Sequence, residues 1–347
     1  SKIRMEKAHH QLKIKRHFST TNCVSYPQKS EGAVQERWCW VSLCLMDEWI
    51  DDVIEHDGLI LRERALCQGV DPDQIMKALR TGRIRRVQRC VYVRRGTEAA
   101  PLALARAAVL SSGVADAVAS HQTAARVHAI AVPDGRWPEH ITVARNERRI
   151  RRRELICHGR ALAQGDVELR DDVPVTTAVR SLLDMSAEVP RLNAVWAIDD
   201  AVRRGVVSAR QIAMSLATRP GGRGDGVIKL RVAESDGQAE SILETAGRLA
   251  LKDAGVELPT AQHEVFAGGE LVARLDAAYP ERQLGLEFDG AAVHEAPRAV
   301  YRDRQRQNRL LQLGWTLLRF TWWDVVHDPA GFVATVRRAL ERQRSWV

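Results

Sequence analysis

The segment between Arg274 and Gly290 constrains the fold of this 347-residue chain more than any other. Two apolar runs, 271–279 and 284–288, flank the turn-forming sequence Pro-Glu-Arg-Gln. Short apolar runs on either side of a turn are typical of a β-hairpin. A two-residue loop at Glu281-Arg282 would place Asp276 directly opposite Glu287.

This register predicts a cluster of three carboxylates. Residues two apart on a strand share a face, so Glu287 and Asp289 point the same way, beside Asp276. Carboxylates this close repel one another unless a cation lies between them, and a hard divalent cation such as Mg²⁺ is the usual solution. The alternative is a structural hairpin whose carboxylates form ion pairs with Arg274 or Arg282.

The length of the chain allows two or three domains, each large enough to bury a core. The densest apolar run, 38–46, is far shorter than the ~18 residues of a membrane span. We therefore expect no membrane association and a cytoplasmic location. Cys67, Cys90 and Cys157 are too widely spaced for a disulfide framework or a zinc site.

Residues 1–45 differ in composition from the rest of the chain. They hold five of the eight lysines and three of the six cysteines, whereas the remainder is rich in Arg and Ala. A helical pattern opens at Met46. We interpret residues 1–45 as a non-native or disordered extension, with a targeting peptide as the alternative.

Positive charge is concentrated in two stretches. The whole chain has a formal net charge of +8, but residues 46–347 carry only +3. Residues 77–95 contain eight Lys or Arg and no acid, and residues 145–153 contain six Arg and one Glu. Such local charge on an otherwise acidic body is typical of a phosphate-binding face.

Residues 46–95 predict a winged helix-turn-helix domain. Asp71, Pro72 and Gln74 form a capping-box pattern that opens the third of its helices. The spacing of apolar residues predicts helices over 47–56, 61–68 and 71–80, then a basic strand pair over 83–93. Three short helices followed by a basic wing is the layout that binds duplex DNA.

Ten basic residues are the candidate DNA ligands, and double-stranded DNA is the expected partner. They lie in the third helix, in the wing and in the second basic stretch: Lys77, Arg80, Arg83, Arg85, Arg86, Arg89, Arg148, Arg149, Arg151 and Arg152. Lysine and arginine at such positions contact backbone phosphates. A solvated, Arg-rich hairpin with no ligand is the alternative.

Three short motifs in this region match a known family: Gly58 to Arg64, Gly82-Arg83-Ile84-Arg85-Arg86-Val87 and Val91-Tyr92-Val93. They resemble the N-terminal domain of AbiEi-type antitoxins, over about fifty residues. The resemblance implies DNA contact and autoregulation. It makes a cognate toxin or another defence-system protein a candidate partner.

Residues 96–219 are predicted to form a mixed α/β domain with little recognisable chemistry. Helices are expected over 101–118 and 120–127, with Ser120 as the cap, and over 178–185 and 191–204; strands 141–144 and 154–158 are expected to be joined by a basic hairpin loop, 145–153. We interpret His121 and His128 as structural residues rather than ligands. The Gly-rich sequence after Pro220 lacks the Lys-Ser/Thr of a phosphate loop and predicts a linker over 220–231.

Residues 232–347 predict a small mixed α/β sheet domain. A helix over 236–254 would carry Glu240 and Glu244 one turn apart on one face. The further elements expected are strands over 262–267, 271–279, 283–288 and 315–321, and helices over 299–313 and 331–343. The whole chain is therefore expected to be α/β, as an α+β multi-domain protein with a winged helix, a mixed middle domain and a C-terminal mixed sheet flanked by helices.

The C-terminal motifs are more specific than those of the winged helix. They are Ala239-Glu240-Ser241, Arg274-Leu275-Asp276, Tyr279-Pro280-Glu281, Leu286-Glu287-Phe288-Asp289-Gly290, His294, Arg302-Asp303, Arg306 and residues 314–321. This set resembles the domain-of-unknown-function family 559, which belongs with the very short patch repair endonucleases in the PD-(D/E)xK nuclease superfamily. The resemblance implies a restriction-endonuclease-like fold.

The resemblance also implies roles for individual residues. Asp276 and Glu287 would hold Mg²⁺, Glu240 would reach the same site from its helix, and Asp289 would take the last position of the Glu-x-Lys motif. No organic cofactor is implied. The ion would polarise the scissile phosphate and help generate hydroxide from bound water.

One departure from the superfamily concerns the general base. The chain has no lysine beyond Lys252, whereas the superfamily usually places one two residues after the glutamate. Very short patch repair enzymes also replace this lysine. His294 is the best substitute, since an imidazole accepts a proton near neutral pH, and an exposed loop histidine is the alternative.

These observations favour a DNA-binding protein with a Mg²⁺-dependent endonuclease domain that hydrolyses phosphodiester bonds. The first alternative is an AbiEi-like antitoxin or transcriptional regulator whose nuclease-like domain is catalytically inactive. The second is an interaction scaffold in a defence or toxin module.

Overall fold

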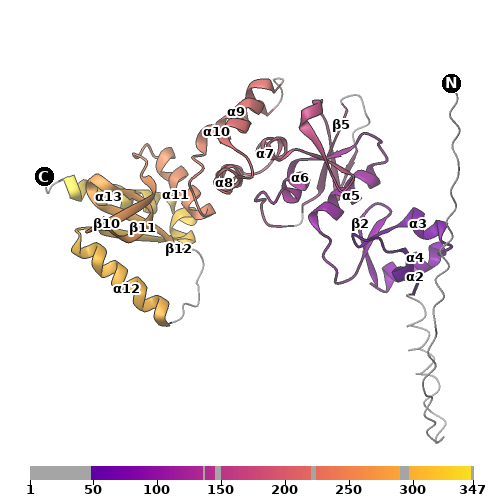
Figure 1. The fold of residues 1–347 in the computed structure, drawn as a ribbon, viewed down its shortest axis with the longest axis horizontal. Coiled ribbons are helices and arrows are strands. Elements are labelled where there is room, and N and C mark those ends of the chain that lie inside the picture. The colour runs from indigo at the N-terminus through magenta and orange to yellow at the C-terminus, as the bar shows by residue number, and fades with distance from the viewer. Residues whose placement is uncertain (1–47, 136, 145–149, 220–223, 290–296, 345–347) are drawn as a thin grey trace, which may run out of the picture. The chain divides into compact units, whose positions relative to one another are not determined.

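The computed structural model describes residues 48–135, 137–144, 150–219, 224–289 and 297–344. Helices alternate with three mixed or antiparallel sheets, so the predicted α+β multi-domain class is confirmed (Figure 1). The expectation for residues 1–45 lies outside the described residues. No helix within these ranges combines the length and the apolar character needed to cross a bilayer.

The first module is a small helical layer on a three-stranded sheet. Its elements are α2 (Glu48–Val53), β1 (Leu59–Leu61), α3 (Arg62–Cys67), α4 (Pro72–Arg80), β2 (Ile84–Gln88) and β3 (Val91–Arg94), with strand order β1-β3-β2. Asp71 caps α4 as expected: its side chain accepts a hydrogen bond from Asp73 N at 2.7 Å, and the Gln74 side chain accepts one from Asp71 N at 2.9 Å. This reciprocal cap fixes where α4 begins.

The core of this module continues past residue 95. One face of its sheet packs against α2, α3 and α4 through residues such as Ile60 and Ile75. The other face packs against Ala103 and Ala107 of the next helix, α5 (Pro101–Ser112). The helix that opens the middle region is thus also part of the core of the first module.

A six-stranded sheet forms the first half of the middle region. Its elements are β4 (Val118–Ala119), α6 (His121–Val127), β5 (Glu139–Val143), β6 (Arg151–Arg152), β7 (Leu155–Gly159), η1 (Gln164–Asp166), β8 (Val167–Arg170) and β9 (Val173–Thr176), in strand order β6-β7-β5-β4-β9-β8. Small buried residues such as Ala108 and Ala124 let α5 and α6 lie close to this sheet.

The predicted hairpin of residues 141–144 and 154–158 is wrong. β5 and β7 are parallel neighbours, with Thr142 opposite His158. Parallel strands cannot be joined by a tight turn. The chain instead folds back one strand later, where β6 pairs antiparallel with β7. Residues 145–149 of the expected basic loop lie outside the described residues.

Four helices complete the middle region: α7 (Ala178–Ser186), α8 (Arg191–Arg203), α9 (Ala209–Thr218) and α10 (Asp225–Glu234). Their shared core contains Leu182, Ile198, Ile212 and Ile228. The linker predicted over 220–231 is therefore helical from Asp225 onwards, because Ile228 is fully buried in this core. Residues 220–223 lie outside the described part of the chain.

The C-terminal domain is a four-stranded mixed sheet between helices (Figure 1). Its elements are α11 (Ile242–Asp253), β10 (Thr260–Ala267), β11 (Glu270–Tyr279), η2 (Pro280–Arg282), β12 (Leu284–Asp289), α12 (Pro297–Gln312), β13 (Thr316–Thr321), the π-helical turn η3 (Trp323–His327) and α13 (Pro329–Arg344). The strand order is β10-β11-β12-β13, and only the β12–β13 pair among them is parallel. Phe288 and Phe332 lie in the core formed with α11 and α13, whereas Leu310 of α12 packs in a second core on β10 and β11.

The first helix of this domain begins later than predicted. Ser241 is its N-cap and accepts a hydrogen bond from Glu244 N at 3.2 Å. Glu240 therefore precedes the helix, and the prediction of Glu240 and Glu244 on one helical face is wrong. The helix begins after Ser241 and not at Asp236, because the Ser241 side chain accepts from a backbone N–H of the first turn that would otherwise lack a partner.

Candidate metal centre of the C-terminal domain

Asp276 and Glu287 are neighbours across β11 and β12, in the register that the hairpin predicted. Ala277 pairs with Leu286, and Tyr279 pairs with Leu284, so one step further sets Asp276 beside Glu287. At that step the acceptor of the hydrogen bond between the strands is a side chain and not a backbone carbonyl: Asp276 Oδ2 accepts from Phe288 N at 2.8 Å. The connection differs from the expected two-residue loop, since it is the 3₁₀ turn η2.

The Asp276 carboxyl lies in an environment that disfavours its charge. Burial raises the pKa of Asp276, and the hydrogen bond from Phe288 N opposes this effect. The negative charges of Asp289 and Glu240 raise the pKa further, while Arg306 lowers it. The ionised form of this carboxylate would therefore be stabilised by an additional positive charge.

Glu287 is buried and held by two arginines from different elements. Its Oε2 lies 3.0 Å from Arg319 Nε of β13, and its Oε1 lies 2.8 Å from an Arg306 nitrogen of α12. The contact of Oε1 with Arg306 is an ion pair without the geometry of a hydrogen bond. Within the described residues this buried oxygen accepts no hydrogen bond. Burial raises the pKa of Glu287, against the lowering effect of both arginines.

Asp303 completes this group of charges. It lies 2.9 Å from both Arg306 and Arg319, and these pairs lower its pKa despite partial burial. The alternative pairing of the hairpin with Arg274 or Arg282 is not what these contacts show, since Glu287 pairs across the sheet with α12 and β13.

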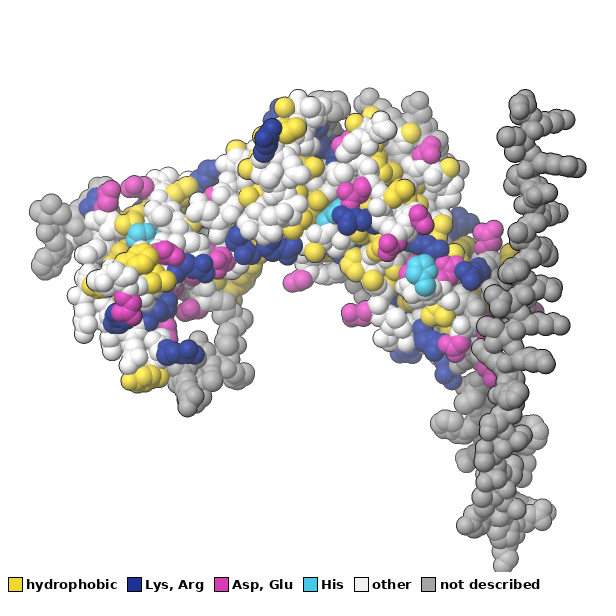
Figure 2. All heavy atoms as spheres, in the orientation of Figure 1, with side chains coloured by type: hydrophobic (Ala, Val, Ile, Leu, Met, Phe, Trp, Pro, Cys, Tyr) yellow, Lys and Arg dark blue, Asp and Glu magenta, His cyan; other side chains and the backbone are white. Residues whose placement is uncertain are grey.

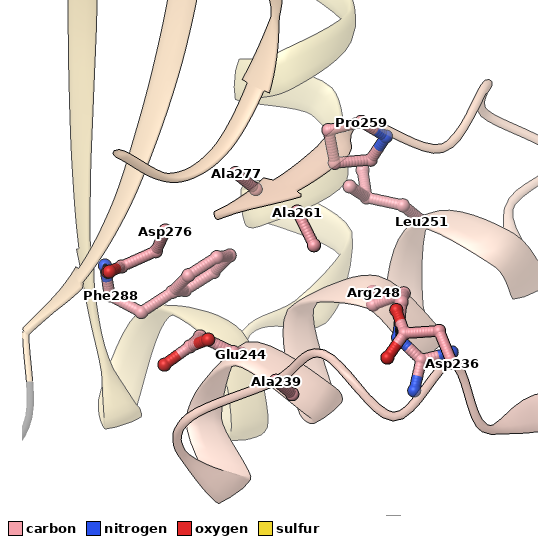
Figure 3. A pocket seen from close by; sticks show the side chains of 10 residues that line it. All are labelled: Asp236, Ala239, Glu244, Arg248, Leu251, Pro259, Ala261, Asp276, Ala277 and Phe288. Carbon is pink, nitrogen blue, oxygen red and sulfur yellow. Dashed lines mark hydrogen bonds and ion pairs between the residues drawn. The ribbon is translucent and has the colours of Figure 1, made fainter. Parts of the chain in front are cut away.

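Glu244 faces the site from α11, in the place that was expected for Glu240. It lines a small hollow together with Asp276 and Phe288, and Figure 3 shows its carboxylate and that of Asp276 at one end of this hollow. Glu244 accepts hydrogen bonds from Glu240 N at 2.8 Å and from Gln262 Nε2 at 2.9 Å. Burial raises its pKa, and the charge of Asp276 adds to this effect.

The other predicted site residues lie at the margin or cannot be placed. Glu240 forms an ion pair with Arg274 at 2.8 Å on the surface. Asp289 ends β12 with an exposed side chain, and its charge still reaches Asp276. His294 lies outside the described residues. The pattern Ser241-x-x-Glu244 is a capping-box signal that could have located Glu244 from the sequence.

The ten candidate DNA ligands differ in how exposed their side chains are. Lys77 and Arg80 of α4, and Arg83, Arg85, Arg86 and Arg89 around β2, all have exposed side chains. Figure 2 shows Lys and Arg side chains beside acidic ones over this module. Arg151 is exposed on β6, whereas Arg152 is half-buried and donates to Ser111 O at 3.0 Å. Arg148 and Arg149 lie outside the described residues.

Comparison with known proteins finds a family similar to the C-terminal part. A family model described as REase_MTES_1575 matches residues 251–340, a range that contains Asp276, Glu287 and Asp289 but neither Glu240 nor Glu244. Two proteins of Mycobacterium tuberculosis, "Uncharacterized protein MT2308" of strain CDC 1551 / Oshkosh and "Uncharacterized protein Rv2248" of strain ATCC 25618 / H37Rv, are each 30% identical over 171 residues.

The matched segment is 49% of this chain and 62% of each relative, so it spans less than two thirds of their length. The four-stranded mixed sheet with α11 and α13 on one side and α12 on the other agrees with the family match. The C-terminal part of this chain therefore has a restriction-endonuclease-like mixed sheet and is similar to this family over residues 251–340.

Proposed function

We propose that the C-terminal domain is a Mg²⁺-dependent DNA endonuclease built on Asp276 and Glu287. The observation that carries the proposal is the juxtaposition of half-buried Asp276 and buried Glu287 where β11 and β12 meet, with Oε1 of Glu287 in an ion pair but in no hydrogen bond within the described residues. The restriction-endonuclease-like match contains both residues. Buried carboxylates are costly unless a cation or a hydrogen bond compensates them.

The donor set fits Mg²⁺. This ion is usually held by one or two carboxylates and keeps several of its waters, so Asp276 and Glu287 suffice as protein ligands. Glu244 lines the same hollow as Asp276, close enough that the charge of Asp276 adds to burial in raising the pKa of Glu244, and we propose that Glu244 binds a water of the ion rather than the ion itself. When bound, Mg²⁺ would polarise the scissile phosphate and lower the pKa of a bound water.

Arg306 is the residue that we assign to the role of the usual lysine. Lys252 is the last lysine of the chain, and its Nζ lies 3.5 Å from Ala233 O. One Arg306 nitrogen contacts both Glu287 and Asp303, so this guanidinium lies where it can turn to a phosphate oxygen. We keep His294 as the proposed general base.

We propose that residues 46–95 form a winged helix-turn-helix domain that binds double-stranded DNA. Support comes from the capped helix α4, which is followed by the antiparallel β2–β3 pair with exposed Arg85 and Arg86. Phosphate contacts from such side chains supply affinity that falls with salt. In this proposal the protein is cytoplasmic, and a cognate toxin or another defence protein is a candidate partner.

The second candidate is an AbiEi-like antitoxin or regulator with an inactive nuclease fold. The observation that favours it is the pairing of Glu287 with Arg306 and Arg319, because these arginines already neutralise the carboxylate without a metal ion. The presence of Asp289 at the position where a lysine is usual also favours the inactive regulator.

Plasmid nicking by the full chain with Mg²⁺ or with EDTA tests the enzyme. We expect Mg²⁺-dependent cleavage by the wild type and its loss in Asp276→Asn and Glu287→Gln. Glu270→Gln is the matched control, since Glu270 lies on the same strand and pairs only with Arg309 on the surface among its described contacts.

If Asp276→Asn and Glu270→Gln cleave equally, the endonuclease proposal is wrong. A gel shift with a fragment of duplex DNA separates the second candidate. Replacing Arg83, Arg85 and Arg86 by Ala should abolish the shift, while Asp276→Asn should retain it. A protein that shifts DNA but never nicks it is the inactive regulator.

A further inference from the structure

Three histidines from separate elements meet inside the middle region. His121 begins α6 directly after β4, His140 lies in β5 and His158 lies in β7. Because Thr142 is opposite His158, the side chains of His140 and His158 share one face of the sheet. One ring nitrogen from each of the three lies within 4.8 Å of the others.

The hydrogen bonds of this cluster leave one nitrogen without a partner among the described residues. His140 Nδ1 and His158 Nε2 are 2.9 Å apart and can share a single proton. His121 stacks on His158 with ring centroids 3.7 Å apart, and its Nδ1 lies 3.0 Å from Ser120 Oγ. Its Nε2 is buried and has no hydrogen-bond partner in the described part of the chain.

Buried polar atoms of this kind are usually satisfied, and the cost of an unsatisfied one is about 1–3 kcal/mol. His128, at the other end of α6, shows the ordinary arrangement: its Nε2 lies 2.7 Å from Thr176 O. His121 and His128 were both interpreted from the sequence as structural residues. The Nε2 atom of His128 has a hydrogen-bond partner, whereas that of His121 has none among the described residues.

Four charged side chains act electrostatically on the imidazoles: Arg126, Arg160, Arg180 and Asp184. Arg180 pairs with Asp166 and Asp184 at 2.7 Å each, and Arg219 pairs with Asp184 and Asp225. Arg160 also lies 4.0 Å from Asp184, and Arg126 pairs with Glu139, so Arg126, Arg160 and Arg180 each have an acidic partner.

The imidazoles themselves are neutral. Burial lowers the pKa of His121, lowers that of His140 to about 3 and lowers that of His158 to about 4. The neutral ring is the form that binds a metal ion.

We propose that His121, His140 and His158 bind a Zn²⁺ ion, with a fourth position open to water. Imidazole nitrogen is a preferred ligand of this ion, and three histidines with one open position is an established zinc geometry. The ion would take the place of the proton shared between His140 and His158, the ring that held this proton would carry its N–H on its other nitrogen, and the ion would satisfy Nε2 of His121.

The geometry requires a small adjustment on binding. Zn–N distances of about 2.0–2.1 Å in a tetrahedral site hold two nitrogens about 3.3 Å apart. The His140–His158 pair must therefore open slightly, and the His121 ring must turn out of its stack on His158. The bound ion would tie the start of α6 to β5 and β7.

The test uses the full chain after removal of metal with a chelator. Titration with Zn²⁺ against a chromophoric chelator should show one ion per chain at this site, and Zn²⁺ should raise the melting temperature of the protein. Co²⁺ in the same site should give a visible absorption band of a tetrahedral centre. His121→Ala and His158→Gln should bind Zn²⁺ at least about 100-fold more weakly, since even loss of an outer-shell partner costs about 10–100-fold.

Two control variants establish that the bound ion lies at this cluster. His56→Ala removes an exposed histidine and should bind Zn²⁺ like the wild type. Asp276→Asn should also bind it, because the site is independent of the endonuclease centre. His158→Gln retains an amide that can bond His140, so it decides the matter if His121→Ala does not fold. Equal Zn²⁺ binding by His158→Gln and the wild type, or no stoichiometric uptake by the wild type, overturns the proposal.

Discussion

The partly buried carboxyl of Asp276 makes the stability of the protein depend on pH. Burial raises the pKa of Asp276 above its value in the unfolded chain. The native state then binds the proton more tightly, so the favourable contribution to stability is complete below the unfolded pKa of about 3.9 and is lost as pH rises through the folded value. We expect Asp276→Asn to raise the free energy of unfolding by about 1 kcal/mol at pH 7 without divalent metal.

Asparagine is the informative substitution because its amide oxygen still accepts the hydrogen bond from Phe288 N. Urea unfolding at pH 7 and near pH 3.5 measures the difference, which should vanish at the lower pH. Mg²⁺ should stabilise the wild type and not the variant. An equal loss of stability at both pH values would show that Asp276 is a structural residue.

Arg306 carries the second prediction for a single residue. Only one of its nitrogens is used in the described contacts with Glu287 and Asp303, so a lysine ammonium can replace it. We expect Arg306→Ala to lower the cleavage rate about 10²–10³-fold and Arg306→Lys to retain activity within about tenfold. Single-turnover nicking measures both, and a lysine variant as inactive as the alanine variant argues against the assigned role.

Among the elements, α4 depends on its cap. The Asp71 side chain accepts from Asp73 N and the Gln74 side chain accepts from Asp71 N, and removing a cap of this kind costs about 1 kcal/mol. We expect Asp71→Ala to destabilise the protein by this amount and to weaken the DNA gel shift. Thermal unfolding followed by circular dichroism measures the first effect. Asp52→Ala, on the exposed side of α2, should change neither.

Local signals predicted most of the elements correctly. The Asp71-Pro72 start of α4 and the register of Asp276 with Glu287 depend on residues a few positions apart in the chain. The start of α11 was placed too early because the apolar spacing continues past Ser241, although Ser241 and Glu244 carry the cap.

Contacts between distant segments could not be predicted in this way. The parallel pairing of β5 with β7, and the approach of Arg319 from β13 to Glu287, depend on how the sheets are ordered. The meeting of His121 with His140 and His158 has the same origin, because three elements contribute one residue each. Spacing along one chain carries no information on such pairings.

At the scale of the whole molecule, Asp199 joins α8 to the segment that leads into α11. Its carboxylate accepts hydrogen bonds from Asp236 N at 2.8 Å, Gly237 N at 2.9 Å and Thr245 Oγ1 at 3.1 Å, and it pairs with Arg248 at 2.7 Å. Burial raises the pKa of Asp199, against the lowering effect of Arg248 and of these backbone donors. One buried side chain thus satisfies four donors from the start of the C-terminal domain.

Removing Asp199 leaves three donors without this acceptor and leaves Arg248 with Asp236 as its remaining ion-pair partner in the described residues, and breaking a buried pair of this kind costs about 3–5 kcal/mol. We expect Asp199→Ala to lower the unfolding temperature of the C-terminal domain below that of the middle region, so that calorimetry resolves two transitions. Asp200→Ala is the matched control, because Asp200 pairs only with Arg203 and Arg204 of its own helix in the described contacts. If both variants lose the same stability and unfold alike, Asp199 does not couple the two parts. A separated transition in Asp199→Ala alone establishes that this carboxylate couples the C-terminal domain to α8, beside the ion pair of Arg191 with Asp253.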